Sequence, residues 1–220
     1  MKNVIIYLFI ASFFINACSK KKVDKFQEVY DVEMIGNWNN STHPLDFPTD
    51  AHFSSMVGLS HLADLDVIGE GLLATEGIKS MAETGKTKEI IKEFIKFQNQ
   101  TYSLDTIVGK SFNSPGKAKT QIGVKRGYHT VTVFSMLAPS PDWFVAASTN
   151  LIDPVDGKWY DKVIVHAKVY DAGTDNGLTY KAIDEATNPP ESIQELNYGP
   201  LTNNTDSVRN VVTFIFTRLK

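Results

Sequence analysis

Val-Arg-Asn-Val-Val-Thr-Phe-Ile-Phe-Thr-Arg-Leu, residues 208–219, is the stretch that decides the fold class. β-Branched and aromatic residues dominate it, and it is apolar enough to form the central strand of a β-sandwich. Four earlier stretches are further strand candidates: residues 30–34, 121–125, 130–137 and 163–170. Within the first of these, apolar side chains alternate with polar ones, as a half-buried strand requires. The sequence therefore predicts a fold made mostly of β-strands.

Helical periodicity is confined to one region of the chain. Thr87 is a predicted N-cap. Four apolar residues after it fall on one helical face: Ile90, Ile91, Phe94 and Ile95. A shorter helix is expected at residues 76–83, ending at Gly85. Two short helices among many strands predict an antiparallel β-sandwich with short helices inserted in loops.

Composition and charge are those of a globular protein that does not bind nucleic acid. Of the 220 residues, 42% are hydrophobic and 21% are charged, and the formal net charge is −3. Binding to nucleic-acid phosphates needs a basic surface, which this balance does not supply. No stretch beyond the N-terminal region is apolar for long enough to span a bilayer.

The N-terminal region has the pattern of an export signal. A charged start is followed by a nearly continuous apolar run over residues 4–15, too short to span a membrane comfortably. The run leads into Ile-Asn-Ala-Cys, residues 15–18, which resembles the lipobox of bacterial lipoproteins. We therefore predict a signal peptide at residues 1–17 and lipidation of Cys18, the only cysteine in the chain. A simple secretory signal or a membrane-anchoring helix is the alternative.

Residues 18–27 are then predicted to be the lipidated cysteine and a polar tether. The lysines of the tether lie where they can contact anionic lipid headgroups. The folded domain is expected to span residues 28–220. The lipid anchor makes the membrane a partner of the protein and predicts a location in the bacterial cell envelope, at the outer membrane or the cell surface. The sequence leaves the membrane leaflet open.

The most informative polar stretch is Tyr-Asp-Ala-Gly-Thr-Asp-Asn-Gly, residues 170–177. Its two carboxylates, Asp171 and Asp175, can converge on one ion if glycine lets the chain bend between them. Asp142 offers a third carboxylate from Ser-Pro-Asp-Trp, residues 140–143. Three adjacent carboxylates repel one another without a cation, and calcium takes roughly six to eight oxygens. An ordinary turn is the alternative, since Asn-Gly is typical of type I′ hairpins.

Short motifs over most of the chain resemble, in order, those of the spondin domain, which occurs in F-spondin and in secreted bacterial proteins. They are residues 36–38 (Gly-Asn-Trp), 43–48 (His-Pro-Leu-Asp-Phe-Pro), 52–54 (His-Phe-Ser), His61, 74–85, 140–145 (Ser-Pro-Asp-Trp-Phe-Val), Trp159 and 171–177. The ordered set is specific, although no single motif is diagnostic. The chain is therefore identified as resembling this family.

This resemblance implies a C2-like antiparallel β-sandwich with one calcium ion held by loops at one end. The family's metal-binding aspartates fall on Asp142, Asp171 and Asp175, whose separations of 29 and 4 positions match the family's spacing. Tyr170 stands where the family usually has tryptophan, and Ala146 where it usually has glycine. These two departures put the packing of the loops in doubt. The disulfides of the animal proteins have no counterpart here.

Two other sets of residues suggest alternative sites. The histidines His43, His52 and His61 invite a zinc hypothesis. Their spacing fits neither a helical face nor a zinc knuckle, so hydrogen-bonded structural histidines are expected. A sugar-stacking platform would need exposed tryptophans, and the chain has three: Trp38, Trp143 and Trp159. Aromatic residues spaced along a sandwich are more often core anchors.

The sequence as a whole predicts a binding protein and not an enzyme. We expect a calcium-binding, lipid-anchored protein of the cell envelope that mediates adhesion or partner binding at the surface. This expectation rests on the resemblance, which implies extracellular-matrix and cell-surface interactions in the animal relatives. The partner would be a surface protein or a glycan. One alternative is a carbohydrate-binding module acting on envelope or extracellular glycans, and another is a metal-dependent hydrolase using the histidines with Asp142.

Overall fold

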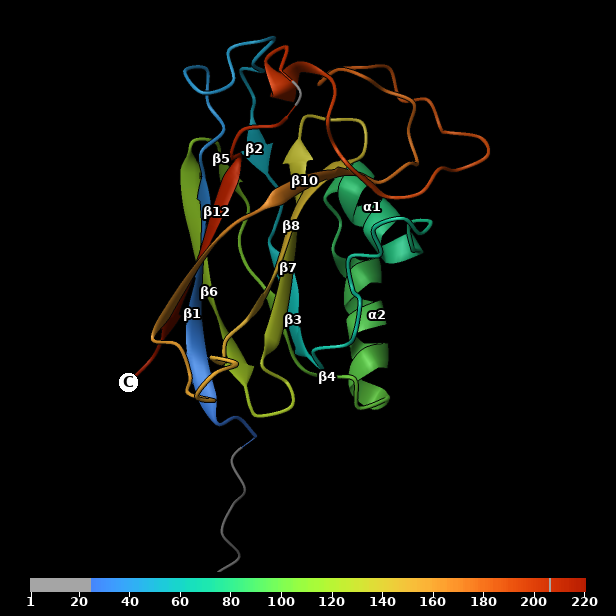
Figure 1. Ribbon diagram of the computed structural model, residues 1–220. Helices are drawn as coiled ribbons and strands as arrows, with labels where there is room; N and C mark the ends of the chain where they lie inside the picture. Colours follow the sequence, from blue (N-terminus) through green and yellow to red (C-terminus); the bar gives the residue numbers. More distant parts are fainter. Residues whose placement is uncertain (1–24, 206) are drawn as a thin grey trace, which may run out of the picture.

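The computed structural model describes residues 25–205 and 207–220 of the chain. Within them two antiparallel sheets face each other and two helices cover the outer face of the larger sheet, giving three layers (Figure 1). The prediction of a mostly β, antiparallel sandwich with short helices is confirmed. The predicted signal peptide (residues 1–17), Cys18 and most of the tether lie outside the described residues. None of the helices in the described ranges is long and apolar enough to cross a membrane.

The smaller sheet has four strands in the order β6–β1–β12–β9. Their bounds are Gly116–Val124 for β6, Glu28–Gly36 for β1, Val212–Arg218 for β12 and Lys162–His166 for β9. Tyr30, Val32 and Met34 of β1 point into the space between the sheets and are fully buried. The alternation of residues 30–34 is thus that of a strand with one face in the core, as predicted.

Strand β12 lies between β1 and β9, which is the central position predicted from residues 208–219. Its ladder begins later than that stretch, because β1 ends at Gly36, the register partner of Val212. One further bond, from the Asn37 N–H to the Val211 carbonyl (2.8 Å), continues the pairing. The central strand is therefore shorter than the apolar run that predicts it.

The larger sheet has eight strands in the order β11–β10–β8–β7–β2–β5, with β3 also pairing with β7 and β4 pairing with β3. Their bounds are Gln194–Glu195 for β11, Lys168–Asp171 for β10, Trp143–Asn150 for β8, Thr130–Ala138 for β7, His52–Phe53 for β2, Phe112–Asn113 for β5, Val57–His61 for β3 and Ser103–Val108 for β4. Every residue of β7 is buried, because both faces of the strand are covered. Val131 and Val133 pack between the sheets, whereas Phe134 and Met136 pack beneath the helices.

The predicted strand at residues 163–170 is in fact two strands, which belong to different sheets. β9 pairs with β12 in the smaller sheet, and β10 pairs with β8 in the larger one. Ala167 is the one residue between them, and its N–H donates to the Val212 carbonyl (2.9 Å). Val165 and Val169 both pack against the core between the sheets. One apolar run therefore serves two strands, and periodicity alone does not reveal the change of sheet.

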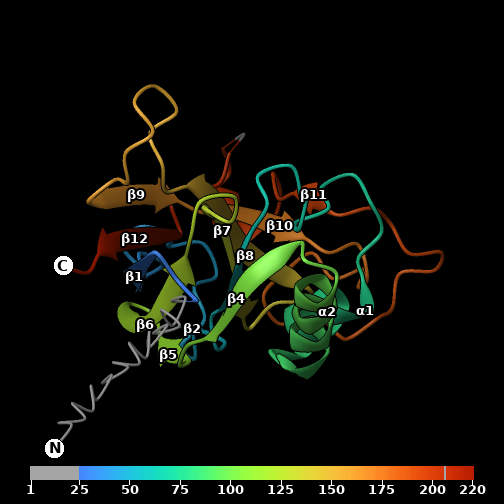
Figure 2. The same ribbon diagram turned by 90° about the horizontal axis from the view of Figure 1, so that it is seen from below.

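Helices α1 (Glu76–Thr84) and α2 (Lys88–Asn99) lie side by side on the outer face of the larger sheet (Figures 1 and 2). The Thr75 hydroxyl oxygen caps α1 by accepting from the Ile78 N–H (3.2 Å). Gly85 ends the helix in the left-handed conformation, as predicted. The two helices form a second core with β3, β7 and β8, so they are a structural layer and more than a loop insertion.

Helix α2 differs from its prediction in two details. Thr87 precedes it, but its side chain makes no capping hydrogen bond, because its backbone is already helical (φ −99°, ψ −6°). Ile90 and Phe94 are buried as expected, whereas Ile95 is 46% exposed. Phe97 packs against the core instead, so the buried face of the helix is rotated from the one the sequence predicts.

Candidate metal centre

The acidic loop and the Ser-Pro-Asp-Trp loop meet at one end of the larger sheet. Asp142 directly precedes β8, and Asp171 is the last residue of β10. These strands are antiparallel neighbours, and Asp171 lies opposite Trp143 in their register. The Ala172 N–H also donates to the Asp142 carbonyl (3.2 Å). Strand pairing therefore places two carboxylates that are 29 positions apart in the sequence at the same edge.

Asp142 is fully buried, which is an unusual position for a carboxylate. Its Oδ2 accepts hydrogen bonds from the Thr174 N–H (2.7 Å), the Thr174 hydroxyl (3.1 Å) and the Asp175 N–H (3.0 Å). Its Oδ1 is buried and has no hydrogen-bond partner among the described residues. Burial, and then the negative charge of Asp171, raise the pKa of Asp142 to about 6 in spite of the three bonds. One oxygen of an ionised carboxylate is thus left unsatisfied at neutral pH.

Asp171 is half-buried and accepts a hydrogen bond at each oxygen. Its Oδ1 accepts from the Gly173 N–H (2.7 Å), and its Oδ2 accepts from the Tyr198 hydroxyl. Burial, and then the bond to Asp171, raise the pKa of Tyr198 well above its ordinary value, so this hydroxyl remains a donor. Gly173 has a φ of +71°, and a Cβ at this position would lie 2.4 Å from the Glu191 carbonyl oxygen. The turn after Asp171 therefore requires glycine.

Asp175 organises the loop that follows it. Its Oδ1 accepts from the Gly177 N–H (2.8 Å), and its Oδ2 accepts from the Glu185 N–H (2.9 Å). Its backbone also forms an antiparallel bridge with Ala186. The buried carboxylate therefore closes residues 176–185 into a loop, which is the local role expected of an aspartate in a turn.

The three predicted ligands share one end of the sheet, but they are not equivalent. Within residues 25–205 and 207–220, no three Asp, Glu, His or Cys side chains converge closely enough to form a metal cluster. Asp142 and Asp171 interact electrostatically, whereas backbone N–H groups occupy the carboxylate of Asp175. The donors nevertheless fit calcium in their chemistry, because all are oxygens and the bare Oδ1 of Asp142 lacks a positive partner.

The three histidines lie apart, and each forms hydrogen bonds in its own surroundings. The Nδ1 of His43 pairs with the Thr42 hydroxyl (2.8 Å), and the Nε2 of His61 pairs with the Thr132 hydroxyl (2.8 Å). His52 bonds to a backbone carbonyl through Nδ1 (2.8 Å). Burial lowers the pKa of His43 and of His61, which favours neutral rings. The expectation of hydrogen-bonded structural histidines is confirmed.

The tryptophans form no exposed platform. Trp38 and Trp143 are fully buried, and their rings pack against that of Tyr180 with centroids 5.3 and 5.8 Å away. Trp159 is partly buried and packs against Tyr30 (6.5 Å). A buried ring cannot stack on a sugar, so the interpretation as core anchors is confirmed for Trp38 and Trp143.

The two departures from the family pattern both lie in the core. Tyr170 is buried, and its ring stacks on that of Phe144 with a centroid distance of 5.4 Å and an interplanar angle of 20°. Ala146 is also buried and lies opposite Lys168 in the pairing of β8 with β10. Both positions thus pack well without the family's usual residues.

Sequence patterns do not identify Thr174 and Tyr198 as part of this site. Thr174 supplies two of the three donors to Asp142, and Tyr198 supplies the donor to Asp171. Tyr198 lies 27 positions after Asp171 and follows the pairing of β10 with β11. A strand of two residues such as β11 produces no periodic signal, so the sequence offered no means of placing Tyr198.

Comparisons with known proteins support the resemblance seen in the sequence. The family model described as Spondin_N matches residues 28–208. Spondin-1 of Gallus gallus is 33% identical over 175 residues, which cover 76% of this chain and 22% of that protein. Spondin-1 of Homo sapiens is 31% identical over 175 residues, covering 76% of this chain and 21% of that protein. Spondin-2 of Homo sapiens is 26% identical over 189 residues, covering 81% of this chain and 54% of that protein.

The aligned part of the chain thus spans 22% of the chicken Spondin-1 and 54% of the human Spondin-2. The similarity therefore covers only part of the length of these relatives. The family model includes both aspartate loops, since residues 28–208 contain them. Because the family model matches most of the sequence, this chain belongs to the spondin N-terminal domain family.

Proposed function

We propose that this protein is a calcium-binding adhesion protein of the bacterial cell envelope, held by a lipid anchor at Cys18 and binding a surface protein or glycan. Membership of the spondin family supports a binding role outside the cell. The export signal and lipobox pattern of residues 1–18 support the anchor. The buried Oδ1 of Asp142, which has no partner among the described residues, is the observation on which the calcium proposal rests.

Asp142, Asp171 and Asp175 would hold the ion, with backbone carbonyls and water completing its shell. A bound cation would supply the positive charge that the adjacent carboxylates of Asp142 and Asp171 lack. Because only the folded chain presents these groups together, calcium would stabilise the fold by RT ln(1 + [L]/Kd), about 2.7 kcal/mol at a hundredfold excess over Kd. The loops that carry the ligands would become more rigid.

Rigid loops at this end of the sandwich would favour partner binding, because less conformational entropy is lost when the complex forms. The two fully buried tryptophans, Trp38 and Trp143, give no support to a carbohydrate-binding module based on stacking. Adhesion through the loops or a sheet face is therefore the function that we carry forward.

Thermal melts of the protein expressed from the full sequence test the calcium site. The protein is melted in EDTA and then with calcium, magnesium or zinc added back. We expect calcium to raise Tm selectively, and Asp142→Asn and Asp171→Asn to lose that rise. Asp184→Asn is the matched control, because Asp184 is an exposed acid in the loop closed by Asp175. An equal calcium response in all variants, or a response to zinc alone, would refute the site.

Fractionation of cells tests the anchor separately. The wild-type protein should sediment with membranes and incorporate a radiolabelled or clickable fatty acid. Cys18→Ser should abolish the label, because the thiol is the group that accepts the diacylglyceryl unit carrying the labelled fatty acids. A wild-type protein that takes up no label would show that the lipobox assignment is wrong.

A further inference from the structure

Strand β9 forms one edge of the smaller sheet and pairs with β12 on one side. Two bonds at its ends define which backbone groups face β12: the Arg218 N–H donates to the Asp161 carbonyl, and the Ala167 N–H donates to the Val212 carbonyl (both 2.9 Å). In an antiparallel ladder the residues that exchange such bonds alternate. The backbone N–H and C=O groups of the odd-numbered residues of β9 therefore point toward β12, and those of the even-numbered residues point away from it.

The outer edge of β9 consequently presents the N–H and C=O groups of Lys162, Ile164 and His166. None of these groups makes a hydrogen bond to another part of the chain that the structure describes. Their side chains point to the outer face of the sheet, and that of Ile164 is 56% exposed. The backbone hydrogen-bonding groups of this edge are thus unpaired, within the described residues, at three alternate positions of β9.

The composition of β9 makes this open edge noteworthy. Its sequence, Lys-Val-Ile-Val-His, has three consecutive β-branched residues and contains neither proline nor glycine. Its ladder with β12 runs in unbroken register from residue 162 to residue 166, so no bulge twists the edge away. Natural sheets usually block such an edge, because it readily pairs with another strand. Lys162 is the one charged residue of the strand.

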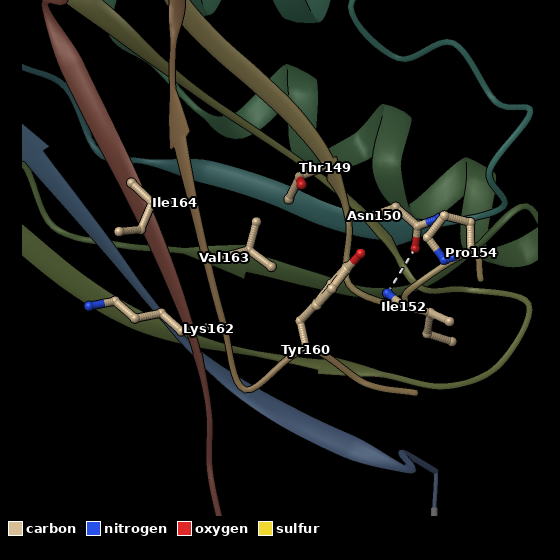
Figure 3. A pocket seen from close by; sticks show the side chains of 8 residues that line it. All are labelled: Thr149, Asn150, Ile152, Pro154, Tyr160, Lys162, Val163 and Ile164. Atoms are coloured by element: carbon tan, nitrogen blue, oxygen red, sulfur yellow. Dashed lines mark hydrogen bonds between the residues drawn. The ribbon is translucent and has the colours of Figure 1, made fainter. Parts of the chain in front are cut away.

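A groove of about 480 Å³ runs beside this edge (Figure 3). Lys162 and Ile164 of β9 lie on one side of it, and Thr149 and Asn150 of β8 lie on the other. Four further residues complete the lining: Ile152, Pro154, Tyr160 and Val163. The lining is therefore mixed, with Thr149, Asn150 and Lys162 as its polar members beside apolar side chains.

The connection between β8 and β9, residues 151–161, determines what can occupy this edge. In Figure 2 it projects past β9 on the side away from β12. A second copy of the domain, whose own loop would project in the same way, is obstructed from pairing along β9. A single extended peptide carries no such loop.

We propose that the outer edge of β9 binds an extended peptide segment of a partner protein by β-strand addition. The peptide would become a fifth strand of the smaller sheet, bonded to the backbone of Lys162, Ile164 and His166. Its residues opposite Val163 and Val165 would point inward as those side chains do, and they should be apolar. Its residue opposite Lys162 should be acidic, because Lys162 forms no salt bridge with the described residues.

Selection from a random ten-residue peptide library displayed on phage, against the protein expressed from the full sequence, tests this proposal. Enriched peptides should alternate apolar and polar residues and carry an acid at one polar position. Ile164→Pro should weaken their binding at least tenfold, because it removes an N–H that faces the peptide and is not used by β12. Ile164→Thr is the matched control, since it keeps the N–H and the β-propensity, and binding should change less than threefold.

A second measurement does not depend on the folding of a variant. Two versions of a selected peptide are made, one N-methylated at its odd-numbered residues and the other at its even-numbered residues. One version should lose binding and the other should keep it, because only one edge of the peptide pairs with β9. Binding should persist in EDTA, since the groove and the aspartates lie at opposite ends of β8, so this result is independent of the calcium proposal. Failure to enrich any peptide, equal binding to the proline and threonine variants, or a dimer formed through β9 would each overturn the proposal.

Discussion

Asp171 lies directly opposite Trp143 in the pairing of β10 with β8, and this register brings the neighbouring Asp142 to the acidic loop. Asp142 is thus buried beside the end of β10, where Asp171 supplies a second carboxylate. Asp142 retains one oxygen without a partner in the described residues, and the charge of Asp171 helps to raise its pKa to about 6. Several consequences of this arrangement can be measured without knowing the partner.

Stability in EDTA should depend on pH through Asp142. Its pKa is about 6 in the folded protein against an ordinary value of 3.8, so the folded state holds a proton that the unfolded chain has released. The resulting stability is fully present below pH 3.8 and is lost as pH rises through about 6, and the total loss is about 3 kcal/mol as an upper bound. Urea unfolding at several pH values, compared with Asp142→Asn, isolates this contribution. Equal pH dependence of the two proteins would contradict it.

Tyr198→Phe should destabilise the protein, because it removes the donor to Oδ2 of Asp171. A hydrogen bond to a charged group contributes about 1.5 to 3 kcal/mol, and Asp171 would also lose one of its two hydrogen-bond donors. Tyr102→Phe is the control, since Tyr102 is 45% exposed. Chemical denaturation in EDTA measures both changes, and similar small losses in the two variants would show that the bond contributes little.

Gly173→Ala should disrupt the turn after Asp171 for two reasons. The φ of +71° disfavours any residue with a Cβ, and that Cβ would lie 2.4 Å from the Glu191 carbonyl oxygen. Gly71→Ala is a matched control, because Gly71 has a φ of +84° but its Cβ would meet nothing within 4 Å. The control should lose about 1 kcal/mol from backbone strain alone, and Gly173→Ala should lose clearly more. The free energies of unfolding of the two variants should therefore differ; equal values would mean that the loop moves aside.

The buried face of α2 is tested by two neighbouring residues. Phe94→Ala should cost about 3 to 5 kcal/mol, because Phe94 is fully buried against the larger sheet. Ile95→Ala should cost less than about 1 kcal/mol, because nearly half of that side chain is exposed. Denaturant midpoints of the two variants compare these costs directly, and similar costs for both would restore the face predicted from the sequence, which contains both residues.

Local patterns account for much of the fold. The alternation around Val32 and the apolar run around Phe214 correspond to paired strands, β1 and β12, because a strand with one face in the core imposes that pattern. Gly85 marks the end of α1 because a left-handed residue is needed there. Patterns of this kind depend on neighbours in sequence, and they are the part that the sequence predicts well.

Long-range pairing accounts for what the sequence did not predict. The change of sheet at Ala167 is hidden, because the residues on both sides of it face the same core. Tyr198 reaches Asp171 through β11, which is too short to produce a pattern. Asp142, Asp171 and Asp175 were singled out by residue type and family resemblance, yet only the pairing of β8 with β10 shows why the first two come together.

Terbium luminescence tests the central claim most directly. Tb³⁺ substitutes for calcium at oxygen sites and emits when a nearby tryptophan is excited, and Trp143 is the residue next to Asp142. The account predicts sensitised emission that saturates at about one ion per chain, is reversed by excess calcium, and is lost when Asp142→Asn and Asp171→Asn are combined. Absence of sensitised emission from the wild-type protein, or equal emission from the double variant, would contradict the account.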